Sequence, residues 1–528
     1  MTSPLASFRS LWKDPPRPWH LLLTPAIPLL GLLKDIVWFA PAAVIVVPLA
    51  LAILASLAVA LVVVPMGADR HRSAMAASLL TLTGLSYMTL AVPVIAVANT
   101  AVVALLCGTL VLAAIKLIRT PGSAPILTVT ANRVVAVAVL LLAAPILWSE
   151  WRRPATTVDP LAATESGSTR PDVYVLVLDG YGREDVLRDV FGFQNDLVPY
   201  LRATGFHVLD RAAANYSQTA LSLASALNGD YIPALNPATR NPRDRRGLGD
   251  LINDSRFFRA FVRAGYKLRA YSSEYALVNP LEAHERPAPL IRVNDFTTTL
   301  YETTVVPTLL NAVGLERGAL PMYLHRRHID WTLAHLAANA PDGSQPALVF
   351  AHILAPHPPF AFDADGGARR TRMPALLGDG DMWHRMAATT GERYESGYLD
   401  TLRALNTRVT TAVKAIAARE RRAIVLIHSD HGPGSGVEWE RPDRTDVRER
   451  LSILTAVRFP DGEAAAVSSD LTLVNVYRAV LNRALGTAVP RLEDRSYHST
   501  WERPFDFIDV TERLRALDGG LPGAANGR

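Results

Sequence analysis

The chain has 528 residues, of which 49% are hydrophobic and 20% are charged, and its formal net charge at pH 7 is +5. A chain of this length is expected to form two or three domains. The positive charge comes from scattered arginines without a basic stripe or interleaved aromatic side chains, which argues against nucleic acid as a partner. Cys107 is the single cysteine, which excludes an intramolecular disulfide and a cysteine-based zinc site.

The first part of the chain has the composition of a membrane domain. Charged residues are nearly absent from Trp19 to Trp148 and become frequent from Arg152 onward. Because a membrane-spanning helix needs about 20 apolar residues, the sequence predicts a multi-pass membrane domain of about five transmembrane helices within residues 1–150. The predicted spans are residues 19–33, 37–64, 74–91, 92–115 and 134–148, and the third is divided from the fourth near Pro93.

The basic residues of the short loops predict the orientation of these helices. With five spans, three basic groups fall on one side: Arg9, Lys13 and Arg17; Arg70 and Arg72; Lys116, Arg119 and Arg133. Cytoplasmic loops carry an excess of Lys and Arg, so we expect a cytoplasmic N-terminus and an extracytoplasmic chain after Trp148. The spans lack the buried charged side chains that mark a transport path, which favours anchoring and substrate presentation over transport.

The second part of the chain has the pattern of an α/β domain. Residues 151–171 are rich in Pro, Ser and Thr without apolar periodicity and are expected to form a linker. Residues 172–528 alternate between strand and helix patterns, which predicts a mostly parallel central sheet with helices on both faces. Strands are expected at 173–178, 267–272, 347–352, 423–428 and 451–457, and long helices at 220–227, 250–264, 323–338, 394–418 and 471–485.

Acidic residues follow two of the predicted strands. Asp179 comes directly after the first strand, and Asp430, His431 and Gly432 follow the strand that ends at His428. A carboxylate and an imidazole in one tight turn suit a divalent cation. The alternative for an isolated Asp-His-Gly is a turn aspartate beside a solvated histidine.

Two further segments carry chemically useful side chains. Hydroxyl residues crowd the start of a predicted helix around Thr219, where free amides favour an anion and a hydroxyl can act as a nucleophile; the alternative is an ordinary helix cap. His352 and His357 follow the strand at 347–352 and sit among prolines. They suit a second cation, an oxyanion or a leaving group, although a single histidine at a strand end is more often structural.

These motifs, in this order, resemble the alkaline phosphatase and sulfatase superfamily. The likeness is greatest to membrane-anchored, sulfatase-like phosphoethanolamine and phosphoglycerol transferases of the lipoteichoic-acid-synthase type, which also place membrane helices before an extracytoplasmic catalytic domain. The segment 217–223 resembles their nucleophile segment, with Thr219 at the position of the nucleophile. The resemblance runs from residue 172 to about 485.

The resemblance implies a role for each motif residue. Asp179, Thr219, Asp430 and His431 would bind a zinc- or manganese-type cation, most simply one tightly held ion. Thr219 would be the catalytic nucleophile and form a covalent phospho-threonine intermediate. His357 would hold the phosphate or a second metal, with His352 in support.

The resemblance also predicts the activity and its location. The protein is expected to be a metal-dependent phosphotransferase in the bacterial plasma membrane, moving a phospho-alcohol group from a phospholipid donor to a cell-envelope glycan or lipid. Asp179 stands where those transferases have Glu, and no histidine follows Asp-His-Gly at their spacing. An extracytoplasmic phosphodiesterase or sulfatase-like hydrolase therefore remains an alternative, as does a non-catalytic envelope scaffold.

Overall fold

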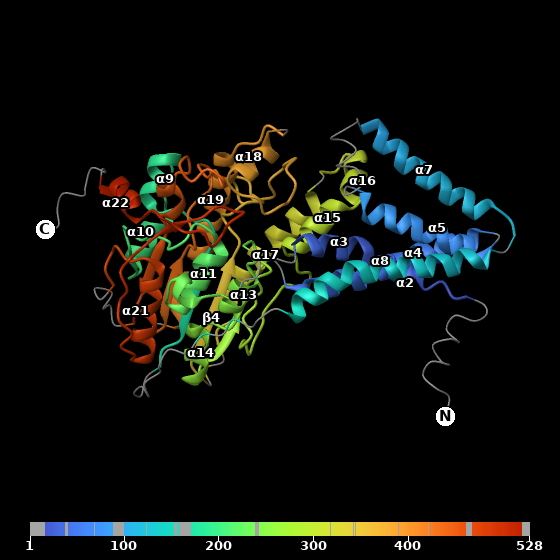
Figure 1. Cartoon of the computed structure of the whole chain (residues 1–528). Helices are drawn as coiled ribbons and strands as arrows, with labels where there is room; N and C mark the ends of the chain where they lie inside the picture. The colour runs from blue at the N-terminus through green and yellow to red at the C-terminus, as the bar shows by residue number, and fades with distance from the viewer. Residues whose placement is uncertain are drawn as a thin grey trace, which may run out of the picture. The chain divides into compact units, whose positions relative to one another are not determined.

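We describe the protein from a computed structural model. It describes residues 16–519 except 37–40, 68, 88–99, 123, 153–155, 157, 159–169, 238–241, 317, 342, 344, 389, 421 and 461–466. The chain forms two compact units. One comprises Met1–Arg153 together with Phe296–Arg317, and the other comprises Pro154–Asp295 and Gly318–Arg528 (Figure 1).

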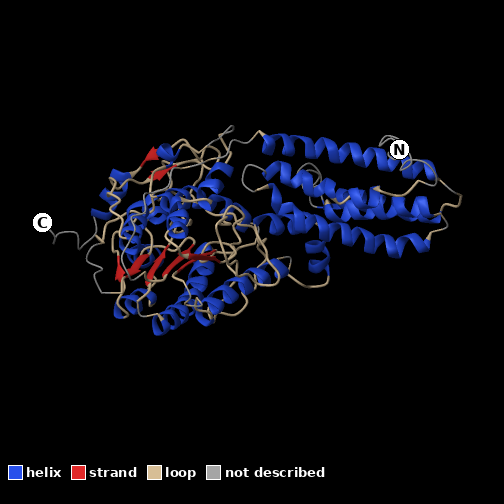
Figure 2. Ribbon diagram, turned by 90° about the horizontal axis from the view of Figure 1, so that it is seen from below, coloured by secondary structure: helices blue, strands red, loops and turns tan. Residues whose placement is uncertain are grey.

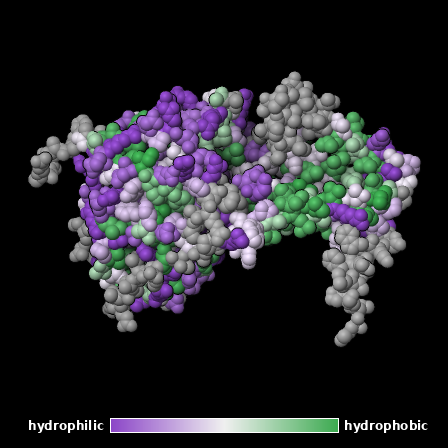
Figure 3. Space-filling view, viewed as in Figure 1, coloured by the Kyte–Doolittle hydropathy of each residue, from purple (hydrophilic) through white to green (hydrophobic). Residues whose placement is uncertain are grey.

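The N-terminal part of the first unit is helical. Its elements are α2 (His20–Leu23), α3 (Ala26–Ile36), the 3₁₀ helix η1 (Ala42–Ile45), α4 (Val46–Met66), α5 (Arg70–Leu85), α7 (Thr100–Arg119) and α8 (Pro125–Trp151). Two stretches within the described residues, Ala42–Met66 and Pro125–Trp151, are long and apolar enough to cross a membrane. Apolar side chains cover much of the visible surface of these helices (Figure 3). The helices thus fit a membrane anchor.

The boundaries of the helices differ in places from the sequence-based prediction. The helix expected at 74–91 begins earlier, at Arg70, because the Asp69 carboxylate accepts hydrogen bonds from the backbone N–H groups of His71 and Arg72. The proposed division near Pro93 lies outside the described residues, as does most of the predicted linker.

The second unit holds a six-stranded sheet. Its strands are β1 (Val173–Leu178), β2 (His207–Val208), β3 (Lys267–Ala270), β4 (Ala347–Ile353), β5 (Ile424–His428) and β6 (Thr455–Arg458), in the order β2-β6-β5-β1-β4-β3. The pairs β1–β4, β1–β5 and β3–β4 are parallel, whereas β5–β6 and β2–β6 are antiparallel. Three of these five strand pairs are parallel, which confirms the predicted mostly parallel central sheet. A separate two-stranded sheet pairs β7 (Tyr497–His498) with β8 (Ile508–Asp509).

Helices cover both faces of the sheet (Figure 2). They are α9 (Glu184–Phe191), α10 (Leu197–Ala203), α11 (Thr219–Asn228), α12 (Ile232–Leu235), α13 (Arg246–Asn253), α14 (Arg256–Arg263), α17 (Ala319–Ala338), α18 (Asp381–Ala387), α19 (Tyr394–Arg419), α20 (Val447–Leu451), α21 (Leu473–Leu485) and α22 (Thr511–Gly519). The remaining helices, α15 (Asp295–Thr303) and α16 (Val306–Ala312), precede α17.

Two predicted elements are wrong in detail. The single helix expected at 250–264 is divided into α13 and α14, because the Ser255 side chain caps α14 by accepting a hydrogen bond from the Phe258 N–H. The strand expected at 451–457 begins at Thr455, because the preceding residues form α20, which the Asp446 carboxylate caps.

β1 lies at the centre of the sheet and is buried on both faces. Val173, Val175 and Val177 pack into one hydrophobic cluster with α11 and α21. The alternate side chains of β1 pack into a second cluster with α17 and α19. The register aligns Leu178 with Ile353 of β4, and Val177 with His428 of β5. The carboxyl ends of three neighbouring strands therefore reach the same level, where sites of parallel sheets form.

Candidate active site

Asp179 follows directly after the central strand β1 and begins a turn whose next position, 180, suits glycine best. Gly180 has φ +78°, and a Cβ there would lie 3.4 Å from Cα of His357. The His357 N–H donates to the Asp179 carbonyl oxygen at 2.9 Å. The Tyr398 hydroxyl donates to the Gly180 carbonyl oxygen at 2.9 Å. The loop after β1 is thus held against the loop that carries His357.

Thr219 is the first residue of α11, as predicted, and it faces His431. Its Oγ1 lies 3.0 Å from Nε2 of His431. One turn further, the Ser222 hydroxyl donates to the Asp430 carbonyl oxygen at 2.6 Å. The start of α11 is therefore fixed on the loop that follows β5.

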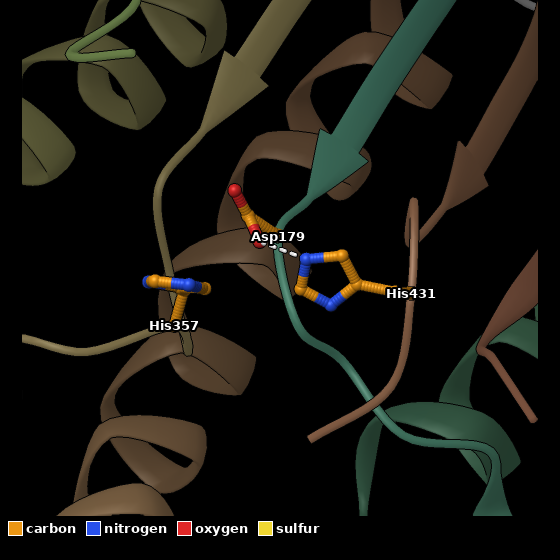
Figure 4. A group of neighbouring side chains, drawn as sticks. All are labelled: Asp179, His357 and His431. Carbon is orange, nitrogen blue, oxygen red and sulfur yellow. Dashed lines mark ion pairs between the residues drawn. The ribbon is translucent and has the colours of Figure 1, made fainter. Parts of the chain in front are cut away.

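The structure brings the six predicted site residues together. Nε2 of His431 lies 3.4 Å from Oδ1 of Asp179 and 3.4 Å from Oδ2 of Asp430. Nε2 of His352 lies 3.3 Å from Oδ2 of Asp179. Ligand atoms of Asp179, His357 and His431 lie within 4.8 Å of one another, and so do those of Asp179, His352 and Asp430. Figure 4 shows the first trio, with a dashed line for the 3.4 Å contact between Asp179 and His431.

Hydrogen bonds fix the tautomers of two site histidines. Nδ1 of His431 lies 2.9 Å from the Gly432 carbonyl oxygen, and Nδ1 of His357 lies 2.6 Å from that of Pro358. A carbonyl can only accept a hydrogen bond, so each Nδ1 carries the proton. In the neutral form of each ring, Nε2 is then the nitrogen with the lone pair that can bind a metal ion.

The buried carboxylates offer unused oxygens. Asp179 and Asp430 are at most 1% exposed. Within the described part of the chain, Oδ1 of Asp179 and both carboxylate oxygens of Asp430 have no hydrogen-bond partner. Burying an ionised carboxylate without partners is costly, and a divalent cation would supply the missing partner. The donor set of carboxylate oxygens and imidazole nitrogens fits zinc or manganese.

The electrostatic environment favours the metal-binding protonation states. Burial raises the pKa of Asp179, but the neighbouring His357, His352 and His431 outweigh it and hold that pKa below its usual range. Burial and the nearby Arg450 lower the pKa of His431 below 6.5. Near neutral pH the site therefore offers an ionised carboxylate and a neutral imidazole, as metal ligation requires.

Two charged residues that the sequence analysis missed complete the cluster. Arg450 is 2% exposed, and its Nη1 lies 2.6 Å from Oδ2 of Asp379, which is 3% exposed. The Nη2 group of Arg450 donates to Nε2 of His431 at 3.2 Å, and its Nε donates to the Ser217 carbonyl oxygen at 2.9 Å. Nε2 of His357 lies 3.8 Å from Oδ2 of Asp379. The sequence analysis missed Asp379 because no predicted strand ends directly before it. The glycines on either side, Gly378 and Gly380, were a signal that could have marked it.

Comparison with solved structures finds matches of low sequence identity. The C-terminal periplasmic domain of EcEptC from Escherichia coli is 14% identical, with a TM-score of 0.40, covering 69% of this chain and 99% of that chain. The phosphonate monoester hydrolase of Agrobacterium radiobacter is 13% identical, with a TM-score of 0.38, covering 66% and 83%. The soluble domain of lipooligosaccharide phosphoethanolamine transferase A from Neisseria meningitidis is 10% identical, with a TM-score of 0.35, covering 61% and 90%.

A search of curated protein sequences finds no match to this chain. The family model described as Sulfatase matches residues 171–484, which is more than half of the chain and includes all six predicted site residues. The sequence, the sheet and the cluster of Asp, His and Thr at its carboxyl edge agree with that match. The chain belongs to the sulfatase family.

Proposed function

We propose that the protein is a membrane-bound, divalent-metal-dependent phosphotransferase. It moves a phospho-alcohol group from a phospholipid donor to a cell-envelope glycan or lipid through a phospho-threonine intermediate. The observation that carries this proposal is the 3.0 Å contact between Oγ1 of Thr219 and Nε2 of His431, beside two buried carboxylates with unpartnered oxygens.

Asp179, Asp430, His431 and Thr219 are the residues that would hold the cation. The bound cation would lower the pKa of the Thr219 hydroxyl and polarise the phosphoryl group. We propose one tightly held ion at this set, with Asp179 as the residue common to both trios of possible ligands.

The chain's own residues would carry the transfer. Oγ1 of Thr219 forms a bond to phosphorus and loses its proton, while the bond from phosphorus to the diacylglycerol oxygen breaks and that oxygen gains a proton. The acceptor hydroxyl then attacks phosphorus and loses its proton, while the bond from phosphorus to Oγ1 of Thr219 breaks and Oγ1 regains a proton. His357, supported by His352, binds the phosphoryl oxygens.

Arg450 supplies a further positive charge in this mechanism. Its Nη2 group shares the single lone pair of His431 Nε2 with the Thr219 hydroxyl. If a cation occupied that lone pair, Nη2 would be free to donate to a phosphoryl oxygen instead. Asp379 holds the guanidinium in place, so Arg450 acts as a fixed charge within the site.

Contacts within the helical unit support the predicted membrane topology. At one end, the Ala124 N–H donates to Asp69 and the Arg72 guanidinium donates to the Gly122 carbonyl oxygen. At the same end, Asn132 donates to the Arg17 carbonyl oxygen. The loops rich in Arg therefore meet at one end of the bundle, which the positive-inside rule places in the cytoplasm.

The proposal is tested with the full chain in proteoliposomes that contain a radiolabelled phospholipid. Metal-loaded protein should release labelled diacylglycerol, and chelation should stop the release. Thr219→Val should abolish it, whereas Ser225→Ala, a hydroxyl loss on the same helix that bonds the Asp230 carbonyl oxygen, should not. Release of a free phospho-alcohol into water without any transfer product would establish the hydrolase instead. No turnover in either assay would contradict both.

A further inference from the structure

Residues 296–316 lie inside the sulfatase-matched region and yet fold with the N-terminal helices. The match runs over residues 171–484, but Phe296–Arg317 belongs to the same compact unit as Met1–Arg153. The segment contains most of α15 and all of α16 (Figure 1). This segment therefore belongs to the sulfatase-matched sequence but packs with the helical unit.

Contacts of Phe296 and Val305 attach this segment to one end of the helical bundle. Phe296 is fully buried and packs with Leu33 near the end of α3 and Ile146 near the end of α8. The Val305 N–H donates at 2.8 Å to the Gly84 carbonyl oxygen at the end of α5, where helix carbonyls otherwise lack partners. These helix ends are opposite to the Arg-rich loops, so the segment is at the end predicted to be extracytoplasmic.

One face of α16 is apolar and exposed. Val306 and Leu309 of α16 are 41% and 57% exposed, and their spacing of three residues places them on one side of the helix. Val313, the C-cap residue that follows, is 74% exposed. Leu315 follows at 53% exposure. Asn311 is exposed on the opposite side of the helix. No charged residue occurs between Thr303 and Leu315, so water would surround an uncharged, apolar helix face.

We propose that the exposed face of α16 lies in the outer lipid–water interface of the membrane. This inference rests on the proposed membrane-bound function and adds a lipid-contacting surface to it. With seven residues, α16 extends about 10 Å, which is too short to span a bilayer but suits a helix lying in its surface. Exposed apolar side chains also occur along α4 of the same unit, for example Leu54 and Leu61.

The segment changes how the catalytic unit is attached. The chain passes between the two units near residues 153, 295 and 317, rather than only through the predicted linker. Three covalent connections restrict the conformations of the catalytic unit more than one linker does. A lipid-bound α16 would thus add a membrane attachment next to two of these three connections.

Site-directed spin labelling of the full chain in nanodiscs of phosphatidylethanolamine and phosphatidylglycerol tests this inference. Cys107→Ser provides a background without cysteine. Labels are attached through Leu309→Cys, Val313→Cys and Asn311→Cys in separate proteins. The expected result is that labels at 309 and 313 collide more with oxygen than with the water-soluble NiEDDA, and that the label at 311 shows the reverse.

A label attached through Leu54→Cys, on the exposed face of α4, separates this inference from the function on which it rests. If the label at 54 reports lipid while those at 309 and 313 report water, the inference is wrong and the anchor stands. If all labels report water, the membrane anchor itself is contradicted and the inference falls with it. If 309 and 313 are shielded from both reagents, protein covers α16, which also overturns the inference.

An activity measurement gives a second, independent test. The double substitution Leu309→Ser with Val313→Ser should raise the KM for a vesicle-borne phospholipid by about fivefold. It should leave the hydrolysis of a soluble chromogenic phosphodiester unchanged, because neither residue lies in the active site. Asn311→Ser is the matched control and should alter neither reaction. Equal KM values for the double variant and the control would overturn the inference.

Discussion

Oγ1 of Thr219 lies 3.0 Å from Nε2 of His431, although 212 positions separate the two residues in the chain. α11 presents the hydroxyl, and the turn after β5 presents the imidazole. The proton on Nδ1 of His431 is committed to the Gly432 carbonyl oxygen. Nε2 is therefore the atom that brings the proposed nucleophile next to the carboxylates that we propose as cation ligands.

Thr219 should be indispensable for turnover. Thr219→Val removes the attacking oxygen at nearly constant volume, so we expect kcat to fall by about a thousandfold or more. Thr219→Ser keeps the hydroxyl and should retain measurable activity. Steady-state kinetics with a soluble phosphodiester provide the measurement, and an unimpaired Thr219→Val variant would exclude Thr219 as the nucleophile.

Asp430 should determine metal affinity. Asp430→Asn replaces a buried anionic ligand by a neutral amide, and we expect the affinity for zinc or manganese to fall by at least about 10- to 100-fold. Calorimetric titration of the chelator-treated full chain measures this directly and without turnover. Asp443→Asn, which removes an exposed carboxylate, is the control and should bind metal as the wild type does. Equal affinities for the two variants would argue against a metal site at Asp430.

Arg450 should bind the phosphoryl oxygens and leave the metal content unchanged. Arg450→Gln removes the positive charge, so the metal-loaded variant should bind inorganic phosphate or vanadate about tenfold or more weakly, as expected when a charge-assisted hydrogen bond is lost. Arg450→Lys keeps the charge without the planar fork and should recover part of that affinity. Inhibition constants and metal content are the two readouts. Unchanged phosphate affinity in Arg450→Gln would contradict this role.

Acid should destabilise the catalytic unit through buried neutral histidines. Burial lowers the pKa of His428 and of His498 from 6.5 to about 4. Below pH 6.5 the unfolded chain binds protons that the folded chain does not, so stability falls as the pH decreases from about 6.5 to about 4. Each group contributes up to about 1.4 kcal/mol per pH unit.

Thermal unfolding between pH 7.5 and 5 measures this effect. His498 stacks on Trp439, and neither ring nitrogen has a hydrogen-bond partner among the described residues. His498→Phe keeps an aromatic ring without a titratable group, so its Tm should decrease less with acid than that of the wild type. Parallel decreases of Tm in the two proteins would show that His498 does not titrate on unfolding.

The sequence predicted those parts of the site that depend on local pattern. An apolar strand followed by an acid marked Asp179 and Asp430, and hydroxyls at a helix start marked Thr219. Asp379 and Arg450 escaped prediction because only the tertiary fold makes them neighbours, 71 positions apart. Likewise, the apolar residues of 296–316 resemble an ordinary core helix of an α/β domain, and tertiary contacts such as those of Phe296 and Val305 assign them to the helical unit.

Peptide mass spectrometry after acid quenching tests the central claim most directly. Metal-loaded protein is mixed with a phospholipid donor in the absence of an acceptor, quenched within the first turnover and digested. The account predicts a phospho-alcohol adduct on Thr219 that disappears when an acceptor is added or metal is removed. Diacylglycerol release without an adduct on Thr219, or with the adduct on another residue, would contradict it.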